Sequence, residues 1–225
     1  MKAQQTKAPK RSELSELSLE NPMDSLGQTA RNILRAAQRM VVERGAGSLH
    51  LSAIAAEAGE SKGSIGYHFG SKDGLIAILV DSFVHDANRA VIEDTSTLPM
   101  GIERIDAFLE SERGIIKDLD DTTGFFELFP KTLRNDQLRA RIAELYHGYY
   151  ETVMLALDVN TEIERKDFEP LARLMIALVD GFSIQYILNP DDEVIDDAIN
   201  LGGAFIRHYL RSIGKIPETM HKYPE

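Results

Sequence analysis

Four side chains between positions 62 and 68 can donate hydrogen bonds, and none of the four is acidic. They share one face if residues 62–69 form a helix, because Ile65 and Phe69 then lie one turn apart and face inward. Ser61 can cap that helix. The outer face is then made by Lys62, Ser64, Tyr67 and His68. Such donors suit phosphate oxygens and the acceptor atoms on the edges of DNA bases.

A second short helix is expected directly before the first. Ser52 can cap it, and its apolar side is Ile54, Ala55 and Ala58 at helical spacing. Gly59 supplies the left-handed residue that ends it. Two short helices joined by a turn, the second with its N-terminal end free to enter the DNA major groove, make a helix-turn-helix.

This stretch resembles the DNA-binding motif of the tetracycline-repressor (TetR) family of bacterial transcriptional regulators. The match covers about a tenth of the chain, in the order and spacing of many residues. Gly66 departs from the pattern, because the family usually has an aromatic residue there that often contacts a phosphate. The matching residues are Ile54, Ala55, Ala58, Gly59, Ser61, Gly63, Ser64, Tyr67, His68, Phe69, Ser71, Lys72, Asp73 and Leu75.

The resemblance implies a double-stranded DNA operator as partner. Lys72 is expected in the first turn of the next helix, where the helix dipole disfavours a cation. A DNA phosphate at that helix N-terminus would explain the lysine, although a tolerated exposed lysine remains the alternative. The residues expected to bind DNA are Ser52, Ser61, Lys62, Gly63, Ser64, Tyr67, His68 and Lys72.

Composition limits the classes of protein that the chain can represent. The 225 residues include no Cys, which excludes disulfides, thiolate nucleophiles and zinc-thiolate sites. Residues 1–20 lack the apolar core of a signal peptide, and no stretch of about 18 uncharged apolar residues could span a membrane. We therefore expect a soluble cytoplasmic protein without a membrane partner.

The net charge of −11 is unevenly distributed. Residues 25–72 carry six basic and three acidic side chains, so the acidic excess lies in the rest of the chain. A basic head on an acidic body suits docking of one end on phosphates. Residues 1–23 are expected to form a flexible arm, whose basic part could alternatively reach DNA phosphates.

The remaining chain shows helical periodicity and no alternating strand pattern, which predicts an all-α fold. Beside the two short helices, helices are expected at 25–44, 71–93, 100–118, 123–133, 136–158, 168–188 and 192–213. Residues 24–72 would form an N-terminal three-helix, helix-turn-helix DNA-binding domain. Residues 73–225 would form a C-terminal helical domain for ligand binding and dimerisation.

Aromatic residues and methionines are concentrated in the middle of the body. They can be plain core, as we expect for Tyr149, or they can enclose an apolar cavity with hydroxyl groups in its wall. The second interpretation predicts a small, largely apolar effector that is neutral or cationic, since the sequence offers the pocket few cations. The expected ligand-binding residues are Phe83, Phe108, Phe125, Phe126, Phe129, Tyr146, Tyr150, Met154 and Met175.

The last two helices are expected to form a homodimer interface. The helix at 168–188 is apolar nearly all round, which indicates burial on more than one side. Burial in protein explains it better than a membrane, where Arg173 and Asp180 would each cost roughly 3 kcal/mol. The resembled family dimerises through two such helices as a four-helix interface.

These features predict a ligand-responsive transcriptional regulator, more readily a repressor than an activator. The helix at 71–93 would transmit the signal, because it joins the head to the body. We expect no enzymatic activity, cofactor or metal. The alternatives are a helical adaptor without DNA binding and a helical-bundle enzyme, for which Glu144 and His147 are weak candidate metal ligands.

Overall fold

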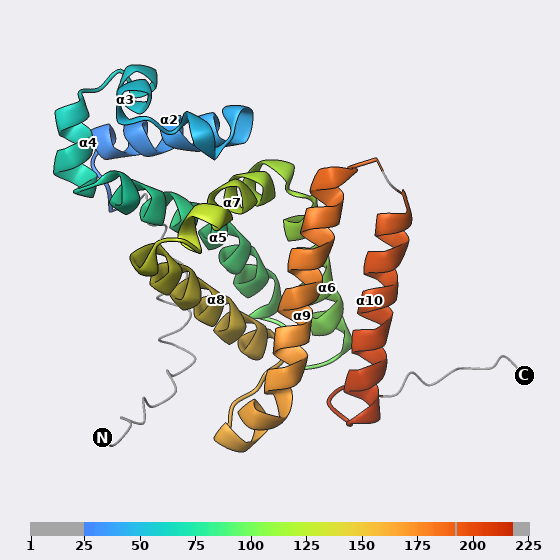
Figure 1. The fold of residues 1–225 in the computed structure, drawn as a ribbon. Coiled ribbons are helices and arrows are strands. Elements are labelled where there is room, and N and C mark those ends of the chain that lie inside the picture. The colour runs from blue at the N-terminus through green and yellow to red at the C-terminus, as the bar shows by residue number, and fades with distance from the viewer. Residues whose placement is uncertain (1–24, 192, 218–225) are drawn as a thin grey trace, which may run out of the picture.

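The computed structural model describes residues 25–191 and 193–217. These residues form α-helices and one short 3-10 turn, with no β-strand among them, so the predicted all-α class is confirmed. The N-terminal arm predicted at 1–23 lies outside the described residues. Figure 1 shows α2, α3 and α4 gathered at one end of α5, with α6, α7 and α8 packed around the rest of α5 and with α9 and α10 farther from it. The elements are α2 (Gln28–Arg44), η1 (Ala46–Ser48), α3 (Leu51–Ala58), α4 (Lys62–Phe69), α5 (Lys72–Thr95), α6 (Ile102–Lys117), α7 (Leu119–Thr132), α8 (Asp136–Ala156), α9 (Glu162–Leu188) and α10 (Glu193–Ser212).

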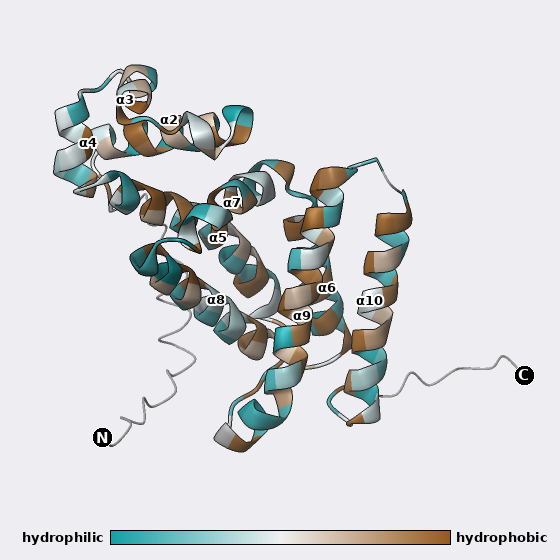
Figure 2. Cartoon of the chain, in the orientation of Figure 1, coloured by the Kyte–Doolittle hydropathy of each residue, from teal (hydrophilic) through white to brown (hydrophobic). Residues whose placement is uncertain are grey.

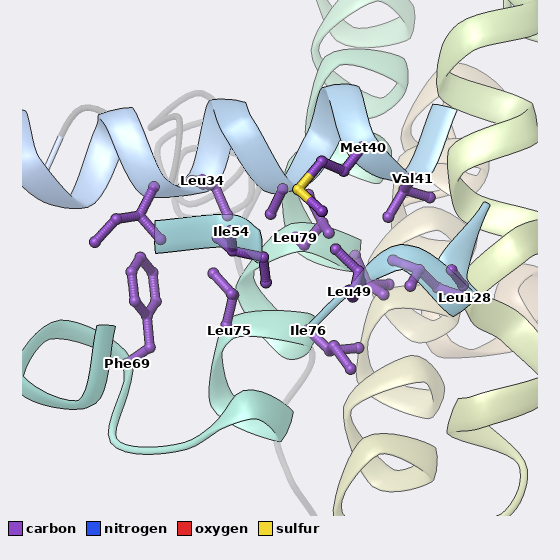
Figure 3. Close-up of a cluster of buried hydrophobic side chains, with 14 of the residues drawn as sticks. Leu34, Met40, Val41, Leu49, Ile54, Phe69, Leu75, Ile76, Leu79 and Leu128 are labelled. Atoms are coloured by element: carbon purple, nitrogen blue, oxygen red, sulfur yellow. The ribbon is translucent and has the colours of Figure 1, made fainter. Parts of the chain in front are cut away.

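The core of the head forms where α2, α3 and α4 meet the first half of α5. Leu34, Ile54 and Leu75 are fully buried in this cluster (Figure 3). Leu128 of α7 joins the same cluster beside Leu49. The head therefore shares its core with α5, α7 and α8, whose Leu138 and Ile142 are buried in the same cluster, and the division at residue 72 stays a prediction.

Two side chains of α7 also hold the backbone of η1. The N–H of Ala46 donates to the carboxylate of Glu127 at 2.9 Å, and the ammonium of Lys131 donates to the Ala46 carbonyl. We call these two contacts the α7 latch. Asn135 adds a hydrogen bond to Asp73 at 2.8 Å. Polar contacts therefore join the head to the body, in addition to helix α5, which runs unbroken from one to the other.

The predicted first residue is wrong for two helices, α7 and α9. Predicted at 123, α7 begins at Leu119 because the Asp118 side chain accepts a hydrogen bond from the Asp121 N–H at 3.0 Å and caps the helix. Predicted at 168, α9 begins at Glu162 because Thr161 and Glu164 form a capping box. That cap outweighs Pro170, which lies inside α9. The other ends lie within three residues of the prediction.

One buried cation closes the C-terminal end of α8. Arg104 is 1% exposed, and its guanidinium donates to the carbonyls of Leu155 at 2.5 Å and Ala156 at 2.8 Å. A third bond reaches the carbonyl of Leu98 at 2.8 Å. The last carbonyls of a helix lack partners within the helix and carry the negative end of its dipole. Arg104 therefore stabilises the joint between α6 and α8.

Exchange of Arg104→Met should lower the free energy of unfolding by at least about 3 kcal/mol, because hydrogen bonds to charged groups contribute about 1.5–3 kcal/mol each. Urea denaturation followed by circular dichroism measures this. The control is Arg139→Met, since Arg139 is exposed and pairs with Asp136 three residues before it. We expect a change within about 0.5 kcal/mol for the control. Equal midpoints for the two variants would contradict the role of Arg104.

Candidate DNA-binding surface and effector cavity

Helix α4 presents its polar side to solvent. Ile65 and Phe69 are buried in the core of the head, 1% and 7% exposed, as their spacing predicts. Tyr67 is 85% exposed, and Lys62 and Gly63 are exposed as well. The expected donors of α4 are therefore on the surface of the head, with Ser64 and His68 half-buried.

The caps of the motif are mostly those expected. Ser61 accepts a hydrogen bond from the Ser64 N–H at 3.0 Å and caps α4, and Ser71 caps α5 through the Gly74 N–H at 3.0 Å. The expectation that Ser52 caps α3 is wrong. The N-cap is His50, whose carbonyl accepts from the Ile54 N–H, so Ser52 lies exposed in the first turn.

The charges of the head favour an anionic partner. Glu57 accepts a hydrogen bond from Arg44 at 3.0 Å and is thus neutralised within the head. Lys62 and Lys72 form no ion pair within the described part of the chain. Burial and the positive charge of Lys72 lower the pKa of Lys131, so these two cations lie near each other. Two lysines thus lie where α5 begins, beside the carboxylates of Asp73 and Glu127.

A cavity of about 380 Å³ lies between α5, α6, α7, α8 and α9. Its volume is in the range of small-molecule sites. Among the described residues that line it are aromatic rings and carboxyl groups, and none is Lys, Arg or His. Four of the nine predicted ligand-binding residues are present: Phe83, Phe125, Phe126 and Tyr146. The carboxyl groups belong to Asp94, Glu110, Asp118, Asp121 and Asp180.

The structure places the other five predicted residues elsewhere. Phe129 packs against the apolar cluster of the head, and Met154 is buried in the core of the body. Phe108 and Met175 line a second cavity, of about 480 Å³, between α6, α9 and α10. Tyr150 packs on the body core outside both cavities. A ligand-binding role for these five stays an untested prediction.

A close contact between α5 and α7 lies between the cavity and the head. A Cβ atom at Gly124 of α7 would overlap the ring of Phe83, so the absence of a side chain allows α5 and α7 to touch there. Phe83 is 3% exposed, lines the cavity and also belongs to the core cluster of the head. The ring of Phe83 therefore contacts the cavity, the core of the head and helix α7.

Two tyrosine–carboxyl pairs lie beside this cavity: Tyr146, Tyr149 and Asp180 line it, whereas Glu112 lines the second cavity. The hydroxyl of Tyr146 donates to Asp180 at 2.9 Å, and that of Tyr149 donates to Glu112. Burial raises the pKa of Glu112 to about 8, although the Tyr149 hydrogen bond lowers it. Burial likewise raises the pKa of Asp180, against the hydrogen bond from Tyr146. Both carboxyl groups therefore hold protons more strongly than an exposed acid does.

Three members of these pairs were not among the predicted ligand-binding residues. Tyr149 was assigned to the core, but its ring lines the cavity. Asp180 and Glu112 were not assigned to the site. A signal existed for Asp180, which is one of few polar side chains in an apolar helix. Nothing in the sequence around Glu112 separates it from the other acids of α6.

The sequence matches two family models. A model described as bacterial regulatory proteins of the tetR family matches residues 33–78, and a model of the C-terminal part of BetI-type transcriptional repressors matches residues 117–213. The comparison with curated proteins gives no match.

Solved structures share the fold at low sequence identity. A transcriptional regulator from Rhodococcus sp. Rha1 is 17% identical, with a TM-score of 0.65 over 80% of this chain and 96% of that one. A protein from Saccharomonospora viridis in complex with choline is 22% identical, with a TM-score of 0.64 over 80% and 96%. The multidrug-binding protein EbrR, complexed with imidazole, is 21% identical, with a TM-score of 0.61 over 90% and 100%.

The helix-turn-helix head on a helical body defines a DNA-binding transcriptional regulator. The chain belongs to the tetR family of bacterial regulatory proteins. Regulators of this family are soluble, form dimers, bind operator DNA and small-molecule effectors, and are generally not enzymes.

The raised pKa of Glu112 predicts a pH-dependent stability. Between its ordinary value of 4.5 and about 8 the folded state binds more protons than the unfolded state, so the free energy of unfolding falls as pH rises. Glu112→Gln should remove this slope, and its stability relative to the wild type should rise with pH. Denaturant titrations across the window measure the effect. The exposed Glu110→Gln should keep the slope, and equal slopes for wild type and Glu112→Gln would contradict the assignment.

Proposed function

We propose that the chain acts in the cytoplasm as a homodimeric repressor, which leaves its pseudo-palindromic operator when a small, largely apolar molecule enters the cavity of about 380 Å³. The observation that supports release is the position of Phe83, which lines that cavity and belongs to the core of the head. Helix α5 continues from Phe83 to Lys72 beside α4, and the α7 latch holds the backbone of η1.

In this proposal α4 enters the major groove of each half-site. Lys62 and Ser64 at its N-terminal end would read base edges, while Lys72 and Tyr67 would contact phosphates. Ser52, Ser61, Gly63 and His68 would complete the surface. The N-terminal end of α5 adds a backbone site for a phosphate.

Removal of the Lys72 ammonium should weaken binding to all DNA sequences alike, because phosphate contacts carry no sequence information. Fluorescence anisotropy with Lys72→Ala should show a slope of log K against log salt that is smaller by about 1. Lys166→Ala is the matched control, since Lys166 is an exposed lysine at the far end of α9. A changed base preference with an unchanged salt slope would contradict the phosphate role.

The dimer would form through α9 and α10, near the predicted spans 168–188 and 192–213. Figure 2 shows apolar residues along both helices. Helix α9 is long and apolar enough to cross a membrane, but core helices of soluble proteins meet the same criteria. In the single chain only 33% of its most apolar stretch is buried, so much of its apolar surface is exposed. A partner copy would cover this surface. Its exposed apolar side chains are Leu174, Ile184, Leu188, Val194, Leu201, Phe205 and Tyr209.

Phe205 is 66% exposed and has an apolar neighbour on the same face of α10 in Leu201. Phe205→Glu should yield monomers that bind operator DNA weakly, because two buried like charges would oppose association at the symmetric interface. Sedimentation velocity at micromolar concentration measures this. Ile163→Glu places the same charge on an exposed apolar site outside the predicted interface and should remain dimeric. A wild-type monomer would overturn the proposal.

Apolar small molecules that raise the melting temperature should lower DNA affinity by roughly 5–150-fold, the usual range of coupling between two sites. Release requires tighter binding of the molecule to the DNA-incompetent arrangement. Thermal-shift screening followed by titration of the DNA complex tests this. Glu127→Ala leaves the cavity intact and removes half of the α7 latch, so it should bind the same molecules with a smaller release. Stabilising molecules that never change DNA affinity would contradict the effector role.

A further inference from the structure

The second cavity, of about 480 Å³, differs from the first in its charged residues. It lies between α6, α9 and α10, and its apolar wall includes Phe108 and Met175, which are 0% and 3% exposed. No basic residue lines the first cavity in the described part of the chain. Three line the second, namely Arg113, Arg207 and Arg211. A molecule in the second cavity therefore meets both apolar surface and positive charge.

Two of the three arginines are neutralised by neighbouring acids. Arg113 pairs with Asp196 at 2.8 Å and lies 3.5 Å from the carboxylate of Glu110. Arg207 pairs with Asp106 at 3.1 Å. Both exposed acids of the cavity wall are thereby paired as well, because they are Glu110 and Asp106.

The side chain of Arg211 forms no hydrogen bond or ion pair with the described residues. It is half-buried in the last turn of α10, and its Nε–H is buried. A guanidinium that is partly removed from water is unfavourable without an anion or another acceptor. Arg211 therefore brings one unpaired positive charge to the wall of the second cavity.

Glu112 brings a hydrogen-bond donor to the same wall. It is 6% exposed, its Oε2 atom accepts from the Tyr149 hydroxyl, and its Oε1 atom is buried without a partner. Burial raises the pKa of Glu112 to about 8, and the charge of Asp180 acts in the same direction, so the carboxyl group holds a proton at pH 7. Because Oε2 already accepts a hydrogen bond, the proton belongs on Oε1. That O–H is then a buried donor without an acceptor.

The two donors lie at different heights between α6 and α10. The pairs Arg207–Asp106 and Arg113–Asn200 show that the two helices run antiparallel. The carboxyl donor comes six residues after Asp106, and Arg211 comes four residues after Arg207 in the opposite direction. Ten helical residues in total correspond to about 15 Å of rise, of which the long arginine side chain spans a part. One small ion cannot reach both donors, whereas an elongated molecule can.

We infer that the second cavity binds a medium-chain organic anion, whose carboxylate pairs with Arg211 and whose far end carries a hydrogen-bond acceptor for Glu112. The apolar chain between the two ends lies against Phe108 and Met175. This site is separate from the effector cavity proposed above. The proposed dimer contact does not cover it, because none of the exposed apolar side chains of α9 and α10 named there lines the second cavity.

Other classes of ligand fit this wall less well. An amine would place a second positive charge beside Arg211. A hydrocarbon would fill the apolar part but leave two buried donors without acceptors, which is costly. A carboxylate forms a charge-assisted hydrogen bond with a guanidinium, and a carbonyl oxygen accepts from the O–H of Glu112.

Monomethyl suberate is the probe, since it has a carboxylate at one end and an ester carbonyl at the other. Dimethyl suberate removes the charge, and octanoate keeps the carboxylate without the far acceptor. Isothermal titration of the full chain at pH 7 should show the tightest binding for monomethyl suberate. We expect at least about tenfold weaker binding of dimethyl suberate and at least about threefold weaker binding of octanoate, because each leaves one donor of the cavity without its partner.

Arg211→Gln keeps a polar side chain and removes the charge. It should lower the affinity for monomethyl suberate by at least about tenfold and leave that for dimethyl suberate unchanged. Arg139→Gln makes the same exchange at an exposed arginine outside the cavity and should bind both as the wild type does. Thermal melting followed by circular dichroism checks that both variants fold.

The pH dependence of binding tests the carboxyl end. The ligand accepts from the protonated group, so its affinity is full below the Glu112 pKa of about 8 and falls by up to about tenfold per pH unit above it. Glu112→Gln keeps an N–H donor and should bind without this fall, whereas Glu110→Gln, at an exposed position of the wall, should retain it. The other ionisable groups around Glu112 are Asp106, Glu110, Arg113, Arg207 and Arg211 in the cavity wall, Tyr149 of α8 and Asp180 of α9.

The inference is overturned if monomethyl suberate does not bind at about 1 mM, or if either of the other two molecules binds as tightly. Unchanged affinity in Arg211→Gln, or a fall above pH 8 that persists in Glu112→Gln, overturns it as well. None of these measurements involves DNA. The anion site can therefore fail while the repressor proposal stands, and it can stand if titrations with DNA contradict that proposal.

Discussion

The continuity of α5 through two cores is the constraint on which the other contacts depend. Its first half is buried with α2, α3 and α4, and its second half forms one wall of the cavity. An unbroken helix transmits displacement because its backbone hydrogen bonds resist bending. At Gly124 helix α7 touches the middle of α5, and three residues later Glu127 begins the latch on η1. The connections through α5 and α7 therefore meet at the ring of Phe83, while Tyr146 of α8 also lines the cavity and packs against the core of the head.

The part of the fold that the sequence predicted well depends on short-range signals. Ser61, Gly59 and Ser71 fix the ends of α3, α4 and α5 through hydrogen bonds and backbone angles within four residues. Those signals are the same in any tertiary context, and the helix-turn-helix could be read from them. The prediction that Ser52 caps α3 was wrong because the N-cap is the residue whose carbonyl accepts the first hydrogen bond of the helix. Leu51 packs against the core of the head and so belongs to α3, which places the N-cap before Ser52.

The cavity could be predicted only in part, because its wall comes from five helices. One residue along a helix turns a side chain by about 100°, which the sequence cannot resolve without knowing where neighbours lie. Tyr149 and Tyr150 are adjacent, yet only the first reaches the cavity. Glu112 meets Tyr149 from 37 positions away, and no local pattern marks such a pair. Composition suggested few cations in the pocket; among the described residues the cavity of about 380 Å³ is lined by none, whereas Arg113, Arg207 and Arg211 line the second cavity.

The small residue in the middle of α4 has a consequence for engineering. Gly66 stands on the outer side of the helix, and a Cβ atom added there meets no atom beyond its own helix. A side chain of any size can therefore be tried at this position without disturbing the buried Ile65 or Phe69. Such residues gain helix propensity over glycine, by about 0.5–1 kcal/mol for Ala. A library at this single site offers a way to vary how tightly the head holds a DNA backbone while the cavity of the body is left as it is.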